Sequence, residues 1–169
     1  MKHKHQLRRR AQAGFSLIEL LIVVAIIGIL AAVALPRLQE NLKLGKQTAA
    51  INTLRTIHQN EAQFNAMKGK FGNLQDLAQA QLIDGNYASG TAINGYAYTS
   101  PVADADKYCV QATRQAASTA YRDFNVIEDG TIRFSETKTP SPVAHGEGSS
   151  LSGGETGGTQ GQGAAQPKQ

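Results

Sequence analysis

The sequence has few of the residues that stabilise small exported domains or build catalytic sites. It has one cysteine in 169 residues, Cys109, so it can form no internal disulfide, and Cys109 is expected to be a buried strand residue. Tryptophan is absent and aromatic residues make up only 6% of the chain. No Ser/His/Asp set, Cys/His metal spacing or phosphate-binding glycine loop occurs. The sequence therefore argues against an enzyme and predicts neither a cofactor nor a resident metal.

Acidic residues are missing from the start of the chain. None precedes Phe15, whereas five basic residues do: Lys2, Lys4, Arg8, Arg9 and Arg10. Without residues 1–14, the 17 Lys and Arg residues become 12 against 13 Asp and Glu, so the formal charge of +4 becomes −1. The positive charge is thus a property of a short leader and not of a nucleic-acid-binding surface, and nucleic acid is not expected as a partner.

The longest apolar run follows the leader directly. Residues 15–35 contain one charged side chain, Glu19, and 21 residues are enough to cross a hydrocarbon core as a helix. The dense basic leader predicts a cytoplasmic N-terminus, with the C-terminal portion on the other side of the membrane. An ordinary secretory signal places its small-residue cleavage site after the apolar run, but here Ala13 and Gly14 precede it. A cut after Gly14 would therefore expose the hydrophobic helix as a new N-terminus.

Gly14-Phe15-Ser16-Leu17-Ile18-Glu19 resembles the cleavage and methylation motif of type IV prepilins and type II secretion pseudopilins. The resemblance implies that a membrane-embedded prepilin peptidase cuts after Gly14 and methylates the Phe15 amine. It also implies an inner-membrane assembly platform and a homo-oligomeric helical filament. Pro36 lies where many pilins carry a helix-kinking proline. The motif covers about the first quarter of the chain, and the missing second cysteine departs from the disulfide-closed C-terminal loop of many bacterial pilins.

Glu19 is expected to act in assembly. A carboxylate within an apolar span costs on the order of 2.5 to 3.5 kcal/mol on insertion scales, so it needs a partner or a purpose. The α-amino group of a processed Phe15 is cationic at neutral pH and would supply one, either in the same chain four residues away or in a neighbouring subunit. The second arrangement makes docking into a filament relieve a buried charge. A glutamate that snorkels or is protonated near the membrane edge is the simpler alternative.

The pattern beyond Pro36 predicts an α+β pilin-like fold. Helix is expected to continue to about Lys68, with one apolar face: Ile51, Leu54, Ile57, Phe64 and Met67. Asn73 to about Ile83 predicts a short second helix, and alternating apolar residues predict a small antiparallel sheet packed on the long helix. The expected strands are 95–99, 107–113, 121–127 and 131–135.

Four segments follow from these patterns: a cleaved leader, 1–14; the transmembrane half of the helix, 15–36; a globular domain, 37–137; and a tail, 138–169. The tail is rich in Gly, Ser, Gln and Pro and is expected to be disordered. Oxygen ligands on loops can bind calcium, and Asp84, Asp104 and Asp106 raise that alternative, but loop aspartates more often form turns. His58 is expected to be a partly exposed structural residue.

Three functions remain open from the sequence. The first is a subunit of a type IV pilus, made as a prepilin that sits among inner-membrane lipids before it enters an extracellular fibre. The second is a type II secretion pseudopilin of a short periplasmic filament. The third is a membrane-anchored binding or adhesive module that never polymerises. Glu19 within the motif 14–19 argues against it, because a plain anchor does not require this residue.

Overall fold

The structure, a computed structural model, describes residues 15–151; the predicted leader, 1–14, and residues 152–169 lie outside the described residues. The chain divides into two compact units, one up to Gln39 and one from Glu40 onward, and each is described by itself.

The first helix, α1, runs over Leu17–Lys68 and confirms the long helix expected from the sequence. In the first unit, every described residue is exposed except the half-buried Ala31. The helix continues without a break through Pro36, so local melting is not observed there, and a bend at this proline stays a prediction. By length and composition, α1 is the one described helix able to cross a membrane.

Within the second unit, α1 buries one face. The expected apolar positions are buried up to Phe64, but Met67 is 59% exposed, so its predicted place in the core is wrong. Phe64 is the last α1 residue in the core, and the final turn of the helix after it adds no residue to the core. The buried residues of α1 are Gln47, Ala50, Ile51, Leu54, Ile57, Glu61 and Phe64.

Two short helices connect α1 to the sheet. Helix α2 covers Leu74–Gln79 and begins at a capping box: the Asn73 side chain accepts from the Asp76 amide at 2.9 Å, and Asp76 accepts from the Asn73 amide at 3.0 Å. This confirms the predicted start at Asn73, although α2 ends before Ile83. A second short helix, α3 at Gly85–Ala88, follows the N-cap Asp84 and was not predicted.

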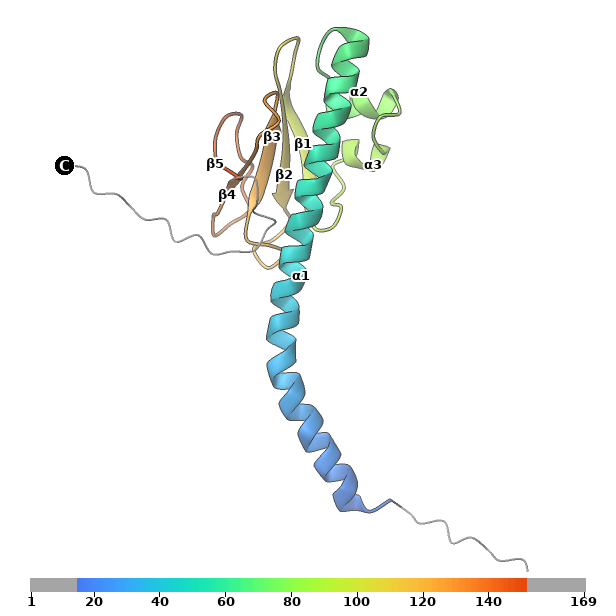
Figure 1. Ribbon diagram of the computed structural model, residues 1–169, viewed down its shortest axis with the longest axis vertical. Coiled ribbons are helices and arrows are strands. Elements are labelled where there is room, and N and C mark those ends of the chain that lie inside the picture. Colours follow the sequence, from blue (N-terminus) through green and yellow to red (C-terminus); the bar gives the residue numbers. More distant parts are fainter. Residues whose placement is uncertain (1–14, 152–169) are drawn as a thin grey trace, which may run out of the picture. The chain divides into compact units, whose positions relative to one another are not determined.

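The sheet is an antiparallel meander in the order β1-β2-β3-β4-β5 (Figure 1). Its strands are β1 Tyr96–Ala103, β2 Tyr108–Arg114, β3 Asp123–Ile127, β4 Ile132–Ser135 and β5 Ser149–Ser150. The four predicted strands are confirmed with ends that shift by up to four residues, and β5 was not predicted. Gly130, with a φ of 71°, lies in the tight turn between β3 and β4, as the sequence indicates.

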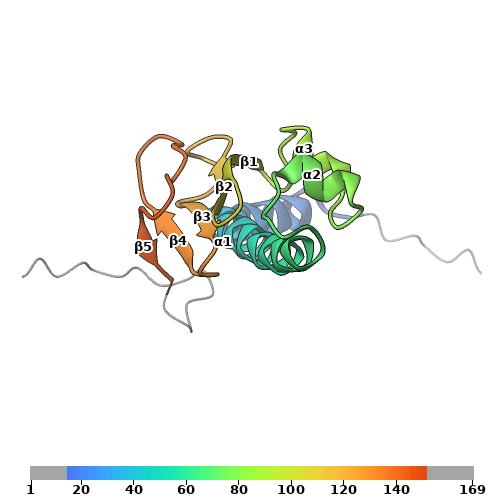
Figure 2. The same ribbon diagram turned by 90° about the horizontal axis from the view of Figure 1, so that it is seen from above.

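The core lies between the sheet and the part of α1 in the second unit, as Figure 2 shows from above. Inward-facing positions alternate along the strands, which is the period-2 pattern of a sheet packed on one face. Their side chains are Tyr96, Tyr98, Tyr108, Val110, Ala112, Phe124, Val126 and Ile132. Leu74 and Leu77 of α2 complete this core.

The segment 138–151, here called the C-terminal strap, is ordered and packs on the face of β2 and β3 opposite the core, which is polar. This differs from the disorder expected for these residues. The Gln111 amide donates to the Val143 carbonyl at 2.9 Å, and the Asn125 amide donates to the Ala144 carbonyl at 2.6 Å. Val143 is 3% exposed, and the Leu151 amide donates to the Ile132 carbonyl at 2.9 Å. Backbone carbonyls of the strap thus satisfy polar side chains of the sheet, which explains its order despite a Gly- and Pro-rich composition.

A buried ion pair also holds the beginning of this segment. The Arg114 guanidinium lies 3.6 Å from the Asp123 carboxylate, and both side chains are buried. Asp123 accepts from the Arg114 amide at 2.8 Å and from the Ser141 amide at 3.1 Å, while the guanidinium donates to the Thr137 carbonyl. Each charge therefore has hydrogen-bond partners, which a buried pair needs to offset its desolvation.

Candidate functional site

The candidate functional site is the N-terminal part of α1, whose large apolar side chains are exposed. Phe15 is 75% exposed, and large apolar residues on all sides of the helix are similarly exposed. They are Leu17, Ile18, Leu20, Leu21, Ile22, Val23, Val24, Ile26, Ile27, Ile29, Leu30, Val33, Leu35, Leu38 and Leu42. A contiguous apolar surface of this size requires a bilayer or other protein chains around it.

Glu19 lies in the first turn of this helix and closes half of a capping box. The Ser16 amide donates to Glu19 Oε2 at 3.4 Å, and the Glu19 amide donates to the Ser16 carbonyl at 3.1 Å. A carboxylate here offsets the unpaired amides and the positive end of the helix dipole. The side-chain contact is long compared with the usual 2.9 to 3.0 Å, so Glu19 is only loosely held within its own chain.

The structure locates the other predicted processing and assembly residues as follows. Gly14 lies outside the described residues. Phe15 is joined to Gly14 in the full-length chain, so its nitrogen is a peptide amide there, and the predicted cut would release it as an amine. Pro36 lies inside α1.

Ser16 is the residue of this site that the sequence reasoning missed. The spacing Ser16-Leu17-Ile18-Glu19 is the S-x-x-E pattern of a capping box directly before an apolar run. That signal predicts both the first residue of the helix and a local partner for Glu19.

A second polar side chain of α1, Glu61, lies buried in the second unit. Glu61 is fully buried; its Oε2 accepts from the Gly72 amide at 3.1 Å, and its Oε1 has no partner among the described residues. The pKa of Glu61 is raised to about 7, chiefly by burial; the Gly72 hydrogen bond opposes this rise, and the nearby Asp76 carboxylate adds to it. One turn earlier, the half-buried His58 shares a hydrogen bond through Nδ1 with the Tyr108 hydroxyl. His58 is therefore a structural residue, as expected.

The aspartates of the calcium alternative act as turn and cap residues. Asp104 Oδ1 accepts from the Asp106 and Lys107 amides at 3.0 and 2.8 Å, and Asp84 Oδ1 accepts from the Asn86 amide at 2.8 Å. Among residues 15–151, no group of three or more His, Cys, Asp or Glu side chains is placed to hold a metal ion. Cys109 is buried in β2, as expected, and burial raises the pKa of its thiol to about 11.

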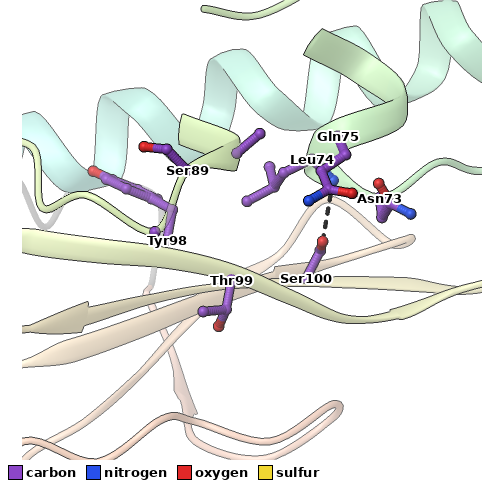
Figure 3. A pocket seen from close by; sticks show the side chains of 9 residues that line it. Asn73, Leu74, Gln75, Ser89, Tyr98, Thr99 and Ser100 are labelled. Carbon is purple, nitrogen blue, oxygen red and sulfur yellow. Dashed lines mark hydrogen bonds between the residues drawn. The ribbon is translucent and has the colours of Figure 1, made fainter. Parts of the chain in front are cut away.

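An open hollow lies between the start of α2, the residues after α3, and β1 (Figure 3). Ser100 in its wall accepts from the Leu74 amide at 3.1 Å, and Asn73 is the cap of α2. These polar groups already have partners within the chain, so they stabilise the connection between α1 and the sheet.

Comparison with known proteins identifies the N-terminal segment. Residues 9–35 match the family described as "Prokaryotic N-terminal methylation motif". The chain is 40% identical over 86 residues to a "Fimbrial protein" of Moraxella nonliquefaciens, which is 49% of this chain and 55% of that protein.

Two further relatives belong to different filament systems. Over 60 residues the chain is 42% identical to "Type IV major pilin protein PilA" of Myxococcus xanthus, which covers 36% of this chain and 27% of that protein. Over 51 residues it is 41% identical to "Type II secretion system core protein G" of Pseudomonas aeruginosa, which covers 30% of this chain and 36% of that protein. The chain thus spans about half the length, or less, of these curated relatives.

Proposed function

Because the N-terminal segment is that of the type IV pilin and type II secretion pseudopilin family, we propose that this chain is a structural subunit of a type IV pilus. It is made as a prepilin, cut after Gly14, methylated at Phe15, and held in the membrane by residues 15–36 until it enters a filament. The observation that carries the proposal is the exposed apolar helix, whose residues up to 35 lie within the matched motif. Such a surface suits a bilayer before assembly and neighbouring copies of α1 afterwards.

The proposed role of Glu19 is to select an incoming subunit. In the single chain it caps its own helix through a long contact to the Ser16 amide. After cleavage, the cationic amine of Phe15 in a second subunit offers a charge-assisted partner, which is stronger than a neutral amide. Docking then exchanges a weak local hydrogen bond for an ion pair in an apolar environment.

The processing step has a direct test. Intact-mass analysis of surface filaments is expected to give a chain that begins at Phe15 and carries one added methyl group. Gly14→Val should leave uncleaved precursor in the membrane, and the matched control Ala11→Val, three residues away, should be processed normally. Recovery of filaments that still carry residues 1–14 would contradict the proposal.

The assembly step is tested with Glu19→Val. This change removes the cost of inserting a carboxylate, so the processed chain should accumulate in the inner membrane while sheared filaments become scarce. Glu40→Gln, which removes an exposed carboxylate from the same helix outside the apolar run, should assemble normally. Normal numbers of Glu19→Val filaments would show that the carboxylate serves only the capping box.

A secretion pseudopilin remains the second candidate, favoured by the likeness to the type II secretion core protein over 51 residues. Deletion of the gene separates the two functions, because loss of long surface fibres indicates a pilus and loss of protein secretion indicates a pseudopilus. The prepilin peptidase and an inner-membrane assembly platform are proposed as partners in both, and no catalytic role is proposed.

A further inference from the structure

A basic surface lies in the second unit where α1 meets the loop between β2 and β3. The Lys43 ammonium lies 4.8 Å from the centroid of the Tyr121 ring, and Tyr121 is 44% exposed. The Lys46 side chain passes beside Gly95, where an added Cβ would lie 3.6 Å from Lys46 Cδ and 2.5 Å from Thr119 Cγ2. We name Lys43, Lys46, Tyr121 and the loop 115–120 the Lys43 surface.

The Lys43 surface carries two positive charges, Lys43 and Lys46, that take part in no ion pair among the described residues. The loop 115–120 contains no charged residue, and Glu40 is the one acidic residue of α1 between Pro36 and Asn60. The two ammonium groups are therefore available to an external anion.

The two lysines follow the apolar run closely in sequence, which is the spacing typical of residues that bind lipid headgroups. The run of 21 residues from Phe15 to Leu35 spans about 31 Å of helix, which matches a hydrocarbon core of about 30 Å. Lys43 follows Leu35 by eight residues, or about 12 Å of helix. Because side chains of an α-helix tilt toward its N-terminus, the long Lys43 side chain extends back toward the headgroup layer.

We propose that the Lys43 surface docks on anionic phospholipid headgroups while the subunit stands in the bilayer before assembly. Lys43 and Lys46 bind the lipid phosphate oxygens, and Tyr121 lies at the membrane–water interface, where tyrosine is enriched. The contact between Lys43 and Tyr121 orders the ammonium without neutralising it. This inference rests on the membrane insertion in the proposed function.

The absence of tryptophan allows a single fluorescent reporter to be placed in this surface. The full-length Tyr121→Trp chain is reconstituted as one copy per lipid nanodisc, in phosphatidylcholine with added phosphatidylglycerol. Either lipid is supplied with bromine near the headgroup end of its acyl chains, which quenches nearby tryptophan. The tryptophan fluorescence should fall to half at a lower fraction of brominated phosphatidylglycerol than of brominated phosphatidylcholine. Lys43→Gln and Lys46→Gln should each raise the required fraction of phosphatidylglycerol about fivefold.

The matched control is Lys68→Gln, which removes an exposed lysine from the far end of the same helix and should change nothing. Equal half-quenching fractions for the two lipids, or an equal effect of Lys68→Gln, would overturn the inference. If the lysine substitutions changed the quenching in discs that hold two copies but not in discs that hold one, the surface would bind a second subunit instead of lipid. Failure of the chain to enter discs would refute membrane insertion itself, whereas insertion without quenching refutes only the Lys43 surface.

Discussion

Replacing Glu61 with glutamine is expected to make the globular unit more stable at pH 8 and to remove most of its pH dependence between pH 5 and 8. The carboxylate is fully buried and accepts one hydrogen bond, from the Gly72 amide. Glutamine has nearly the same shape and can still accept that bond, but it needs no charge to be taken out of water. The change therefore removes a desolvation cost while the packing around α1 is kept.

The magnitude follows from the raised pKa. Burial raises the pKa of Glu61 from 4.5 to about 7, so the folded state binds a proton more tightly than the unfolded state does. A raised folded pKa contributes stability that is fully present below about pH 4.5 and is lost as the pH rises through about 7. The shift corresponds to about 3 kcal/mol in total, and most of that change falls between pH 5 and 8.

Neighbouring groups define the useful pH window. Asp76 on α2 and Tyr108 on β2 lie near Glu61, and Tyr108 bonds His58. At the turn after β3, hydrogen bonds lower the pKa of Glu128 and Asp129, so their contribution to stability is lost only as the pH falls below their usual range. Above pH 5 the carboxyl group with a titration near neutrality is therefore Glu61.

The assay is urea unfolding of the full-length chain in detergent, followed by near-ultraviolet circular dichroism of tyrosine. All five tyrosines lie after residue 86 and there is no tryptophan, so the signal reports the globular unit alone. Glu40→Gln, at an exposed position of the same helix, should keep the parental slope of free energy against pH. If Glu61→Gln also keeps that slope, another group carries the pH dependence and the reasoning from burial is wrong.

Other perturbations address the sheet and its C-terminal strap. Asn125→Ala should lower the free energy of unfolding by about 1 to 3 kcal/mol in the same urea assay, because the Ala144 carbonyl loses its side-chain donor and the Val143 carbonyl keeps only Gln111. Gly148→Ala should lower the melting temperature, since Gly148 has a φ of 93° and an added Cβ would lie 2.8 Å from the Phe134 carbonyl oxygen. Truncation after Lys138 should destabilise the unit, and unchanged thermal unfolding would show that the strap contributes nothing. Cys109 should react with a thiol reagent at pH 8 only after urea unfolding, because burial raises its pKa to about 11; rapid labelling of the native chain would contradict this.

The elements predicted correctly are those with strong local patterns. The apolar run and its extension give α1 from Leu17 to Lys68, and the turn at Gly130 locates the β3–β4 hairpin. The capping residue Asn73 marks the start of α2. Each of these signals is contained within a few neighbouring residues, so no knowledge of distant contacts is needed.

The elements that were missed depend on distant contacts. Gln111 and Asn125 stand opposite each other on β2 and β3, and no neighbouring residue in the sequence indicates what their side chains bind. In the structure their amides meet the carbonyl of Val143, which lies 32 and 18 residues away in sequence. Burial of Glu61 likewise depends on the turn at Gly72 and not on its own neighbours in the chain.

The separation between these partners also bears on the order in which the domain folds and opens. The part of the C-terminal strap around Val143 finds its side-chain partners only once β2 and β3 have paired, because its carbonyls accept from Gln111 and Asn125 side by side. Contacts between residues this far apart form late, and a segment held mainly by side-chain hydrogen bonds opens before the sheet does. The strap is therefore expected to be the last part of the described chain to fold and the first to unfold locally. A nascent subunit must be translated past Leu151 before the whole strap can cover its sheet.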